Sequence, residues 1–137
     1  AHGTLAAHEW AKHGSCTVYA GLFKQEDYWQ LQKWAMGNMS MGNGATLVTL
    51  NVGKNVSYDR LQEAFDADMG GRHATLVCVR SCELDQVWLG FAAVRAPKYM
   101  TYMMVPQIAP EHGVNTLSPS TCAGCTNVYV RAWEGCP

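Results

Sequence analysis

The pattern of apolar and polar positions predicts three helices in the first half of the chain. Thr4 to His13 holds good helix formers and neither Gly nor Pro, so Gly14 is expected to end this helix. Residues 24–36 predict a second helix, and Ser57 is a good N-cap for a third that runs to about Met69 and ends at Gly70-Gly71. The expected apolar stripes of the second and third helices are Tyr28, Leu31, Trp34 and Ala35, and Tyr58, Leu61, Ala64 and Phe65.

Extended segments dominate the second half of the chain. The expected strands are residues 46–52, 74–80, 86–95, 99–105 and 127–133, with loops at 37–45 and 106–125. A link at residues 81–85 is short enough to join the second and third of these strands as an antiparallel pair. Helices first and strands later predict an α+β fold with an antiparallel β-sheet core and packed helices, formed as one domain over residues 1–137.

Composition narrows the class of protein. The chain has 137 residues, of which 48% are hydrophobic and 15% charged, which is typical of a globular domain. A net charge of -1 argues against broad electrostatic attraction to nucleic acid, so an RNA partner would need a small local site. No apolar run approaches the roughly 18–20 residues needed to span a bilayer, and no membrane association is expected.

The cysteines and two glycosylation acceptors point to an oxidising compartment. Six cysteines is a high count for this length, and Asn38-Met39-Ser40 and Asn55-Val56-Ser57 both fit the acceptor pattern. Together they favour a secreted protein, or one in a vacuolar or lysosomal lumen. Asn55 has an alternative interpretation as a loop residue before the Ser57 helix cap.

Four side chains on the first predicted helix form a chemically suggestive cluster. His8, Glu9, Lys12 and His13 share one face, within an arc of about 140° at the helical turn angle. Cleavage of a phosphodiester by its own 2′-hydroxyl needs a base, an acid and positive charge beside the phosphorane, and this set supplies all three. The plain alternative is an ordinary helix with polar side chains facing water.

The string HEWAKHGSC, residues 8–16, resembles the second active-site motif of the ribonuclease T-two family, the Rh-, T- and S-type acid ribonucleases. Only Ser15 departs from the motif, where the family has Thr. The segments GLFKQEDYWQLQKWA, VSYDRLQEAFDADMGG, CELDQVWLGF and the terminal GCP resemble the family more loosely, so the similarity extends over nearly all of the chain.

The resemblance implies a metal-independent endoribonuclease that acts on single-stranded RNA and not on DNA. His13 would be a main acid/base residue, Glu9 and Lys12 would stabilise the pentacovalent phosphate, and His8 would bind phosphate. The products would be 2′,3′-cyclic phosphates and then 3′-phosphates. No cofactor is implied, because imidazoles carry the protons.

One departure from the family is large. The family's earlier motif, His-Gly-Leu-Trp-Pro, supplies the other acid/base histidine and is absent here, and His2-Gly3 shares only two of its letters. The chain is therefore expected to be the C-terminal portion of such a domain. It would work with a separate N-terminal segment, or else be a catalytically incomplete subunit of the same fold that binds partners or is stored.

The resemblance also implies a disulfide pattern. Cys16 would bond to the missing N-terminal chain, and Cys82 would pair with Cys136. The other cysteines leave two options open, a Cys122–Cys125 bridge with Cys78 free, or a bond from Cys78 to one of that pair. A structural zinc site is a further alternative, since Cys78-x3-Cys82 and Cys122-x2-Cys125 have nearly the spacing of four zinc ligands.

Overall fold

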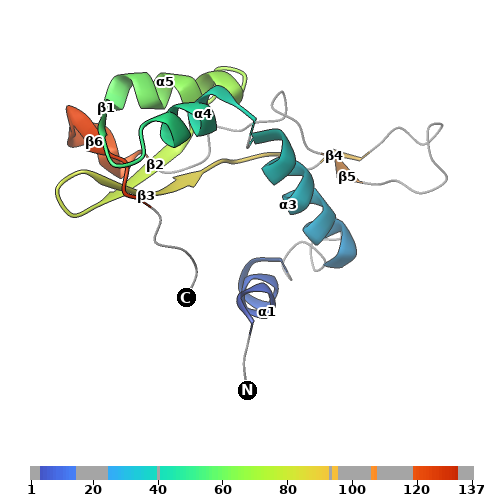
Figure 1. Ribbon diagram of the computed structural model, residues 1–137. Helices are drawn as coiled ribbons and strands as arrows, with labels where there is room; N and C mark the ends of the chain where they lie inside the picture. The colour runs from blue at the N-terminus through green and yellow to red at the C-terminus, as the bar shows by residue number, and fades with distance from the viewer. Residues whose placement is uncertain are drawn as a thin grey trace. The chain divides into compact units, whose positions relative to one another are not determined.

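A computed structural model describes residues 4–14, 25–39, 41–92, 94–95, 106–107 and 119–132 of the chain (Figure 1). They belong to two compact units. The first contains α1 (Leu5–Glu9), η1 (Trp10–Gly14), α3 (Gln25–Met39) up to Gly37, β4 (Val94–Arg95) and β5 (Pro106–Gln107). The second contains α4 (Asn43–Leu50), β1 (Asn55–Ser57), α5 (Tyr58–Asp68), β2 (Thr75–Val79), β3 (Glu83–Trp88), η3 (Thr121–Gly124) and β6 (Asn127–Tyr129).

The first predicted helix is confirmed in extent but is not α-helical throughout. Thr4 caps it, because its Oγ1 accepts a hydrogen bond from the Ala7 N–H at 3.2 Å. Residues Leu5–Glu9 form α1, and Trp10–Gly14 continue as the π-helical segment η1, which ends at the predicted Gly14. Widened π-helical turns of this kind are rare and occur frequently at functional sites.

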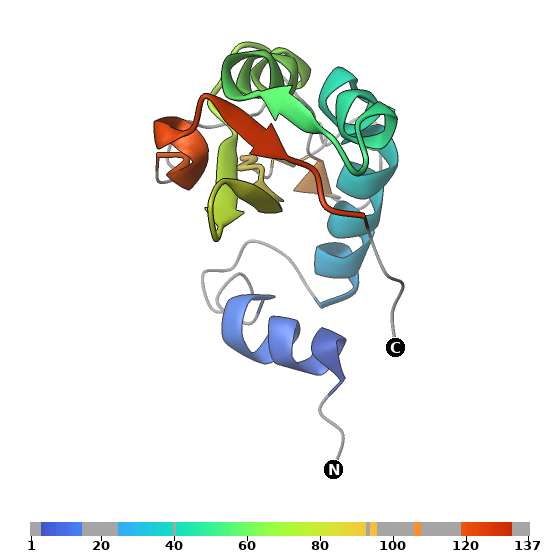
Figure 2. The same ribbon diagram turned by 60° about the vertical axis from the view of Figure 1, so that its left-hand side comes forward.

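The predictions for the segment that follows α3 are mostly wrong. The expected loop at 37–45 is confirmed only at Met41 and Gly42, between α3 and α4, and the expected strand at 46–52 is instead part of the helix α4 and the turn after it. Thr46 and Val48 favour a strand, but packing decides the outcome, because a helix buries Gly44 and Leu47 on one face. α4 and α5 pack on each other and lie side by side in both views of the second unit (Figures 1 and 2).

The third predicted helix is confirmed as α5. The Ser57 Oγ accepts a hydrogen bond from the Arg60 N–H at 3.5 Å, and the helix passes into its C-cap at Met69. Gly70 and Gly71 follow with φ of 66° and 83°, a left-handed conformation that glycine adopts without steric cost. The N-cap and the glycine stop therefore lie where the sequence places them.

The second unit contains a four-stranded, mostly antiparallel sheet in the order β1-β6-β3-β2. The antiparallel pairs are β1 with β6 and β2 with β3, while β3 and β6 run parallel. The α+β class is therefore confirmed. The predicted strand at 86–95 is divided between β3, which begins earlier and stops at Trp88, and β4. The link from β2 to β3 is only Arg80, Ser81 and Cys82, all at positive φ.

The remaining strand predictions are partly tested. β6 confirms the predicted strand at 127–133 in a shorter form. The predicted loop at 106–125 contains the two-residue strand β5, paired with β4, and the short helix η3. The predicted strand at 99–105 lies outside the described residues.

The core of the second unit lies where α5 meets the sheet. Leu61 of α5, Leu76 of β2 and Val128 of β6 have no solvent exposure, and Met69 and Cys122 are equally buried. Gln62 is the unusual member of this region, because its amide is buried and must be satisfied by hydrogen bonds.

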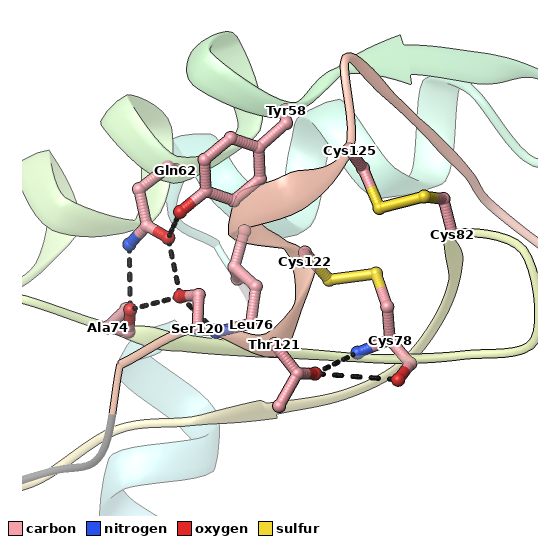
Figure 3. Close-up of a disulfide and its surroundings, with 10 residues drawn as sticks. All are labelled: Tyr58, Gln62, Ala74, Leu76, Cys78, Cys82, Ser120, Thr121, Cys122 and Cys125. Atoms are coloured by element: carbon pink, nitrogen blue, oxygen red, sulfur yellow. Dashed lines mark hydrogen bonds between the residues drawn. A yellow bond between two sulfur atoms is a disulfide. The ribbon is translucent and has the colours of Figure 1, made fainter.

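Gln62 lies at the centre of a buried polar network (Figure 3). Its Nε2 donates to Asp66 Oδ1 and to the Ala74 carbonyl, both at 2.7 Å. Its Oε1 accepts from the Ser120 hydroxyl at 2.7 Å and from the Tyr58 hydroxyl at 3.0 Å. The network thus ties α5 to the start of β2 and to the segment that carries η3.

Two hydroxyl groups cover the outer edge of β2. Ser120 Oγ accepts from the Leu76 N–H, and Thr121 Oγ1 accepts from the Cys78 N–H, each at 2.8 Å (Figure 3). These N–H groups alternate along the strand and point away from β3, so side chains take the place of another strand. The segment at 120–125 therefore closes this sheet edge without extending the sheet.

Candidate functional site

The predicted catalytic residues lie on the continuous helix formed by α1 and η1. His8 and Glu9 are the last two residues of α1, and Lys12 and His13 belong to η1. His8 and Lys12 are exposed and Glu9 is half-buried, while the side chain of His13 lies outside the described part of the chain. Backbone order thus brings the four positions together on one short helix.

The π-helical turn changes the spacing on which the site depends. In an α-helix, positions 8 and 13 lie five residues apart and do not stack. Bonding from residue i to residue i+5 widens the turn, so backbone positions five apart lie more nearly above one another. His8 lies in α1, before this turn, and Lys12 and His13 lie within it, so the angular spacing of the last two positions departs from the α-helical value.

Aromatic rings attach this helix to α3. The Trp10 and Tyr28 rings meet edge to face with centroids 5.5 Å apart, and Tyr28 meets Trp29 in the same manner at 5.0 Å. Trp10, inside the motif, is expected from the sequence to anchor the helix. The ring that Trp10 contacts belongs to α3, so the helix with the charged motif residues packs on α3 within the first unit.

The pKa of Tyr28 is affected by a charged residue of the motif. Burial raises the pKa of its phenol above the usual 10.0, and the nearby Glu9 carboxylate raises the pKa further, while a hydrogen bond with Gln32 lowers it. The sequence places Tyr28 only in an apolar stripe. A tyrosine in an otherwise apolar stripe carries a polar hydroxyl, and this is the feature of the sequence that could have marked Tyr28 as a site residue.

The disulfides differ from the implied pattern. Cys78 is bonded to Cys122 and Cys82 to Cys125, so both the Cys82–Cys136 pair and the Cys122–Cys125 bridge are wrong (Figure 3). The remaining option, a bond from Cys78 to one of the pair, is confirmed. Cys16 and Cys136 lie outside the described residues.

The paired geometry explains the outcome. Cys122 lies within η3 and Cys125 directly follows it. This short helix lies against β2, and the Cα atoms of the two bonded pairs are 5.0 and 5.9 Å apart. The Tyr129 N–H donates to the Cys82 carbonyl at 2.9 Å, which brings β6 beside the β2–β3 turn. Because all four sulfurs are in disulfides, the zinc interpretation of these cysteines is also wrong.

The two glycosylation acceptors occupy different elements. Asn55 is exposed at the start of strand β1 and not in a loop, and Ser57, two residues on, caps α5. Asn38 belongs to α3, and its side chain lies outside the described part of the chain. Within the described ranges, no helix is long and apolar enough to cross a bilayer.

No protein-family model, no curated protein and no solved structure matches the chain.

Proposed function

We propose that this chain is the C-terminal portion of a metal-independent endoribonuclease of the ribonuclease T-two type. The observation that carries the proposal is the HEWAKHGSC motif on the continuous helix α1–η1, with His8, Glu9, Lys12 and His13 on successive turns. The exposure of His8 and Lys12 supports the proposal, because a polymeric substrate must reach these side chains from solvent.

The proposed reaction cleaves the P–O5′ bond of single-stranded RNA. A base removes the proton of the 2′-hydroxyl, whose oxygen attacks phosphorus as the 5′-oxygen leaves. His13, as imidazolium, donates the proton that the leaving oxygen takes up, and Lys12 and Glu9 stabilise the phosphorane, with His8 on a phosphate oxygen. The product is a 2′,3′-cyclic phosphate, which water opens to a 3′-phosphate.

In the ribonuclease T-two family, the base for the 2′-hydroxyl is the histidine of the earlier motif. The earlier histidine motif does not occur in these 137 residues, and a further segment that carries it is part of the proposal. Cys16, in the motif itself, is the proposed attachment point. The alternative function is a binding or storage subunit that has the fold but no complete site.

The proposed compartment is oxidising, either outside the cell or in a vacuolar or lysosomal lumen. Two disulfides form in the second unit, and exposed Asn55 suits glycosylation in the secretory pathway. In a reducing compartment these four cysteines would remain thiols. The two disulfides of the second unit therefore require an oxidising compartment.

The decisive experiment measures cleavage of single-stranded RNA near pH 5 in the presence of EDTA. The purified chain, with a segment that carries the family's first motif supplied, is compared with His13→Ala, and with His73→Ala as a matched control from the second unit. We expect EDTA-resistant cleavage that falls by at least about 100-fold in His13→Ala and is unchanged in His73→Ala.

Intact mass before and after reduction accompanies this assay. A polypeptide released by reduction supports a partner at Cys16. Inactivity of the chain, both as isolated and with a supplied segment carrying the family's first motif, would contradict the enzyme and support the binding subunit.

A further inference from the structure

Helix α4 begins with the one Asn-Gly pair in the sequence, Asn43-Gly44. The backbone nitrogen of a residue can attack the side-chain amide of an asparagine that precedes it, and this makes asparagine thermolabile. Glycine exposes its nitrogen most, because it has no Cβ to shield it. Asn43 is exposed, so water can reach the reacting atoms. The pair is therefore a candidate for spontaneous deamidation.

The reaction proceeds in two balanced steps. The Gly44 nitrogen forms a bond to the side-chain carbon Cγ of Asn43, the Cγ–Nδ2 bond breaks, and the amide proton of Gly44 leaves with the side-chain NH2 as ammonia. Water then opens the cyclic imide at one of its two carbonyl carbons, which gives aspartate or isoaspartate at position 43. The ring can close only if the Asn43 ψ rotates away from the helical value of about -42°.

The folded structure opposes the first step through Asp68. Its Oδ2 accepts from the Gly44 N–H and its Oδ1 accepts from the Asn43 N–H, each at 2.8 Å. The Gly42 carbonyl accepts from the Thr46 N–H at 3.1 Å and from the Thr46 hydroxyl at 2.8 Å, which closes the first turn of α4. The nitrogen that would attack is thus already a donor to a carboxylate, and its residue is held in helical geometry.

Two glycines allow the Asp68 carboxylate and α4 to fit together. Gly44 is buried, and a Cβ there would overlap the Phe65 ring, so the backbone at this point lies directly against α5. A Cβ on Gly42 would overlap the Asp68 carboxylate itself. Gly42 therefore leaves the space that this carboxylate occupies, and the cap depends on both residues.

We propose that Asn43-Gly44 is a latent deamidation site, which Asp68 keeps unreactive while α4 is packed on α5. Opening of the first turn of α4 frees the Gly44 nitrogen, and the conversion that follows is irreversible. The product carries a new carboxylate near that of Asp68, and isoaspartate also adds a carbon to the backbone where Gly44 packs on Phe65. A modified chain cannot rebuild the same cap, so a transient opening becomes a lasting loss of this contact.

The test follows conversion of Asn43 in the full folded chain at mildly alkaline pH. Peptide mapping quantifies aspartate and isoaspartate at position 43, and Asn127, which is exposed and followed by Val128, is the internal reference. We expect the folded wild type to convert at least about tenfold more slowly than the chain unfolded in urea. Asp68→Ala should convert about fivefold faster than the folded wild type, the factor that corresponds to a cap of about 1 kcal/mol.

Three further variants separate the cap from general stability. Gly42→Ala keeps Asp68 but displaces its carboxylate, and should also accelerate conversion. Glu63→Ala, at an exposed position of α5, should not. Ser120→Ala removes a buried hydroxyl that donates to Gln62, far from the cap in sequence, and should leave the conversion of Asn43 near the wild-type rate although it lowers the stability of the second unit.

Three results would overturn the proposal. A folded wild type that converts as fast as the unfolded chain would show that the cap gives no protection. Slower conversion in Asp68→Ala would show that the carboxylate assists the attack as a base. Equal acceleration by Asp68→Ala and Ser120→Ala would mean that conversion follows global unfolding and not the opening of α4. None of these measurements depends on ribonuclease activity.

Discussion

The carboxylate of Asp68, at the end of α5, accepts a hydrogen bond from the Gly44 N–H in the first turn of α4 at 2.8 Å. Its other oxygen accepts from the Asn43 N–H at 2.8 Å. Gly42, at the N-cap position of α4, has no side chain to do this, so the neighbouring helix supplies the cap.

Replacing this cap should therefore destabilise the second unit. We expect Asp68→Ala to lower the free energy of unfolding by about 1 kcal/mol, the usual cost of losing an N-cap. Urea titration measures the effect. Glu63→Ala, at an exposed position of the same helix, is the control and should have a smaller effect, and equal losses in the two variants would contradict the capping role.

Two helical glycines should respond in opposite ways to alanine. A Cβ on Gly44 would overlap the ring of Phe65, whereas a Cβ on Gly37 would meet nothing within 4 Å. Gly37→Ala should raise stability by about 0.5–1 kcal/mol through helix propensity, and Gly44→Ala should lower it by about 1–3 kcal/mol through overpacking. Thermal unfolding of both variants tests the contrast, and a stabilised Gly44→Ala would disprove close contact with Phe65.

The two hydroxyls on the edge of β2 allow a similar comparison. Ser120 is buried and Thr121 is exposed, although each accepts from one β2 N–H. Ser120→Ala would leave the Leu76 N–H and the Gln62 Oε1 without this partner in the core, at a cost of about 1–3 kcal/mol. Thr121→Ala should cost less, because water can replace the hydroxyl, and chemical denaturation that ranks Thr121→Ala as the more damaging variant would contradict the network.

The Cys78–Cys122 disulfide closes a loop with a sequence separation of 44 residues. Because the Cys82–Cys125 bond still closes nearly the same loop, removing the first bond in a Cys78→Ala, Cys122→Ala double variant should lower stability by about 2 kcal/mol on the loop-entropy estimate. Peptide mapping without reduction should find Cys78 linked to Cys122 and Cys82 linked to Cys125. A peptide that links Cys82 to Cys136 would overturn this connectivity.

Tyr28 should titrate above 10.0, the usual pKa of a tyrosine. Burial is the larger cause and Glu9 the second, so Glu9→Gln should lower the pKa of Tyr28 without restoring it fully. Because the pKa is higher in the folded state, this contribution to stability is complete below pH 10 and is lost as the pH rises through the folded-state value. Ring-carbon NMR against pH, with Tyr58 as a reference signal, checks both points, and a Tyr28 pKa unmoved by Glu9→Gln would refute the proximity.

Local signals predicted much of the fold, and tertiary contacts decided the rest. Ser57 and Gly70 mark the limits of α5 because caps and left-handed stops are properties of a few neighbouring residues. α4 was missed because its cap comes from Asp68, more than twenty positions away.

The candidate site divides in the same way. The motif could be found from consecutive letters, and its helix is continuous. The π-helical turn, the contact between Trp10 and Tyr28 and the pairing of Cys82 with Cys125 depend on which segments meet in space, which no local pattern in one sequence encodes.

The place of β6 in the sheet has a consequence for biosynthesis. β6 lies between β1 and β3, although it follows both in the chain by tens of residues. A ribosome makes β1, α5, β2 and β3 before β6, so these segments emerge as a helix and a hairpin with no strand to join them. The sheet can close only once the segment at 119–132 has left the exit tunnel, and chaperones would meet the chain before that moment.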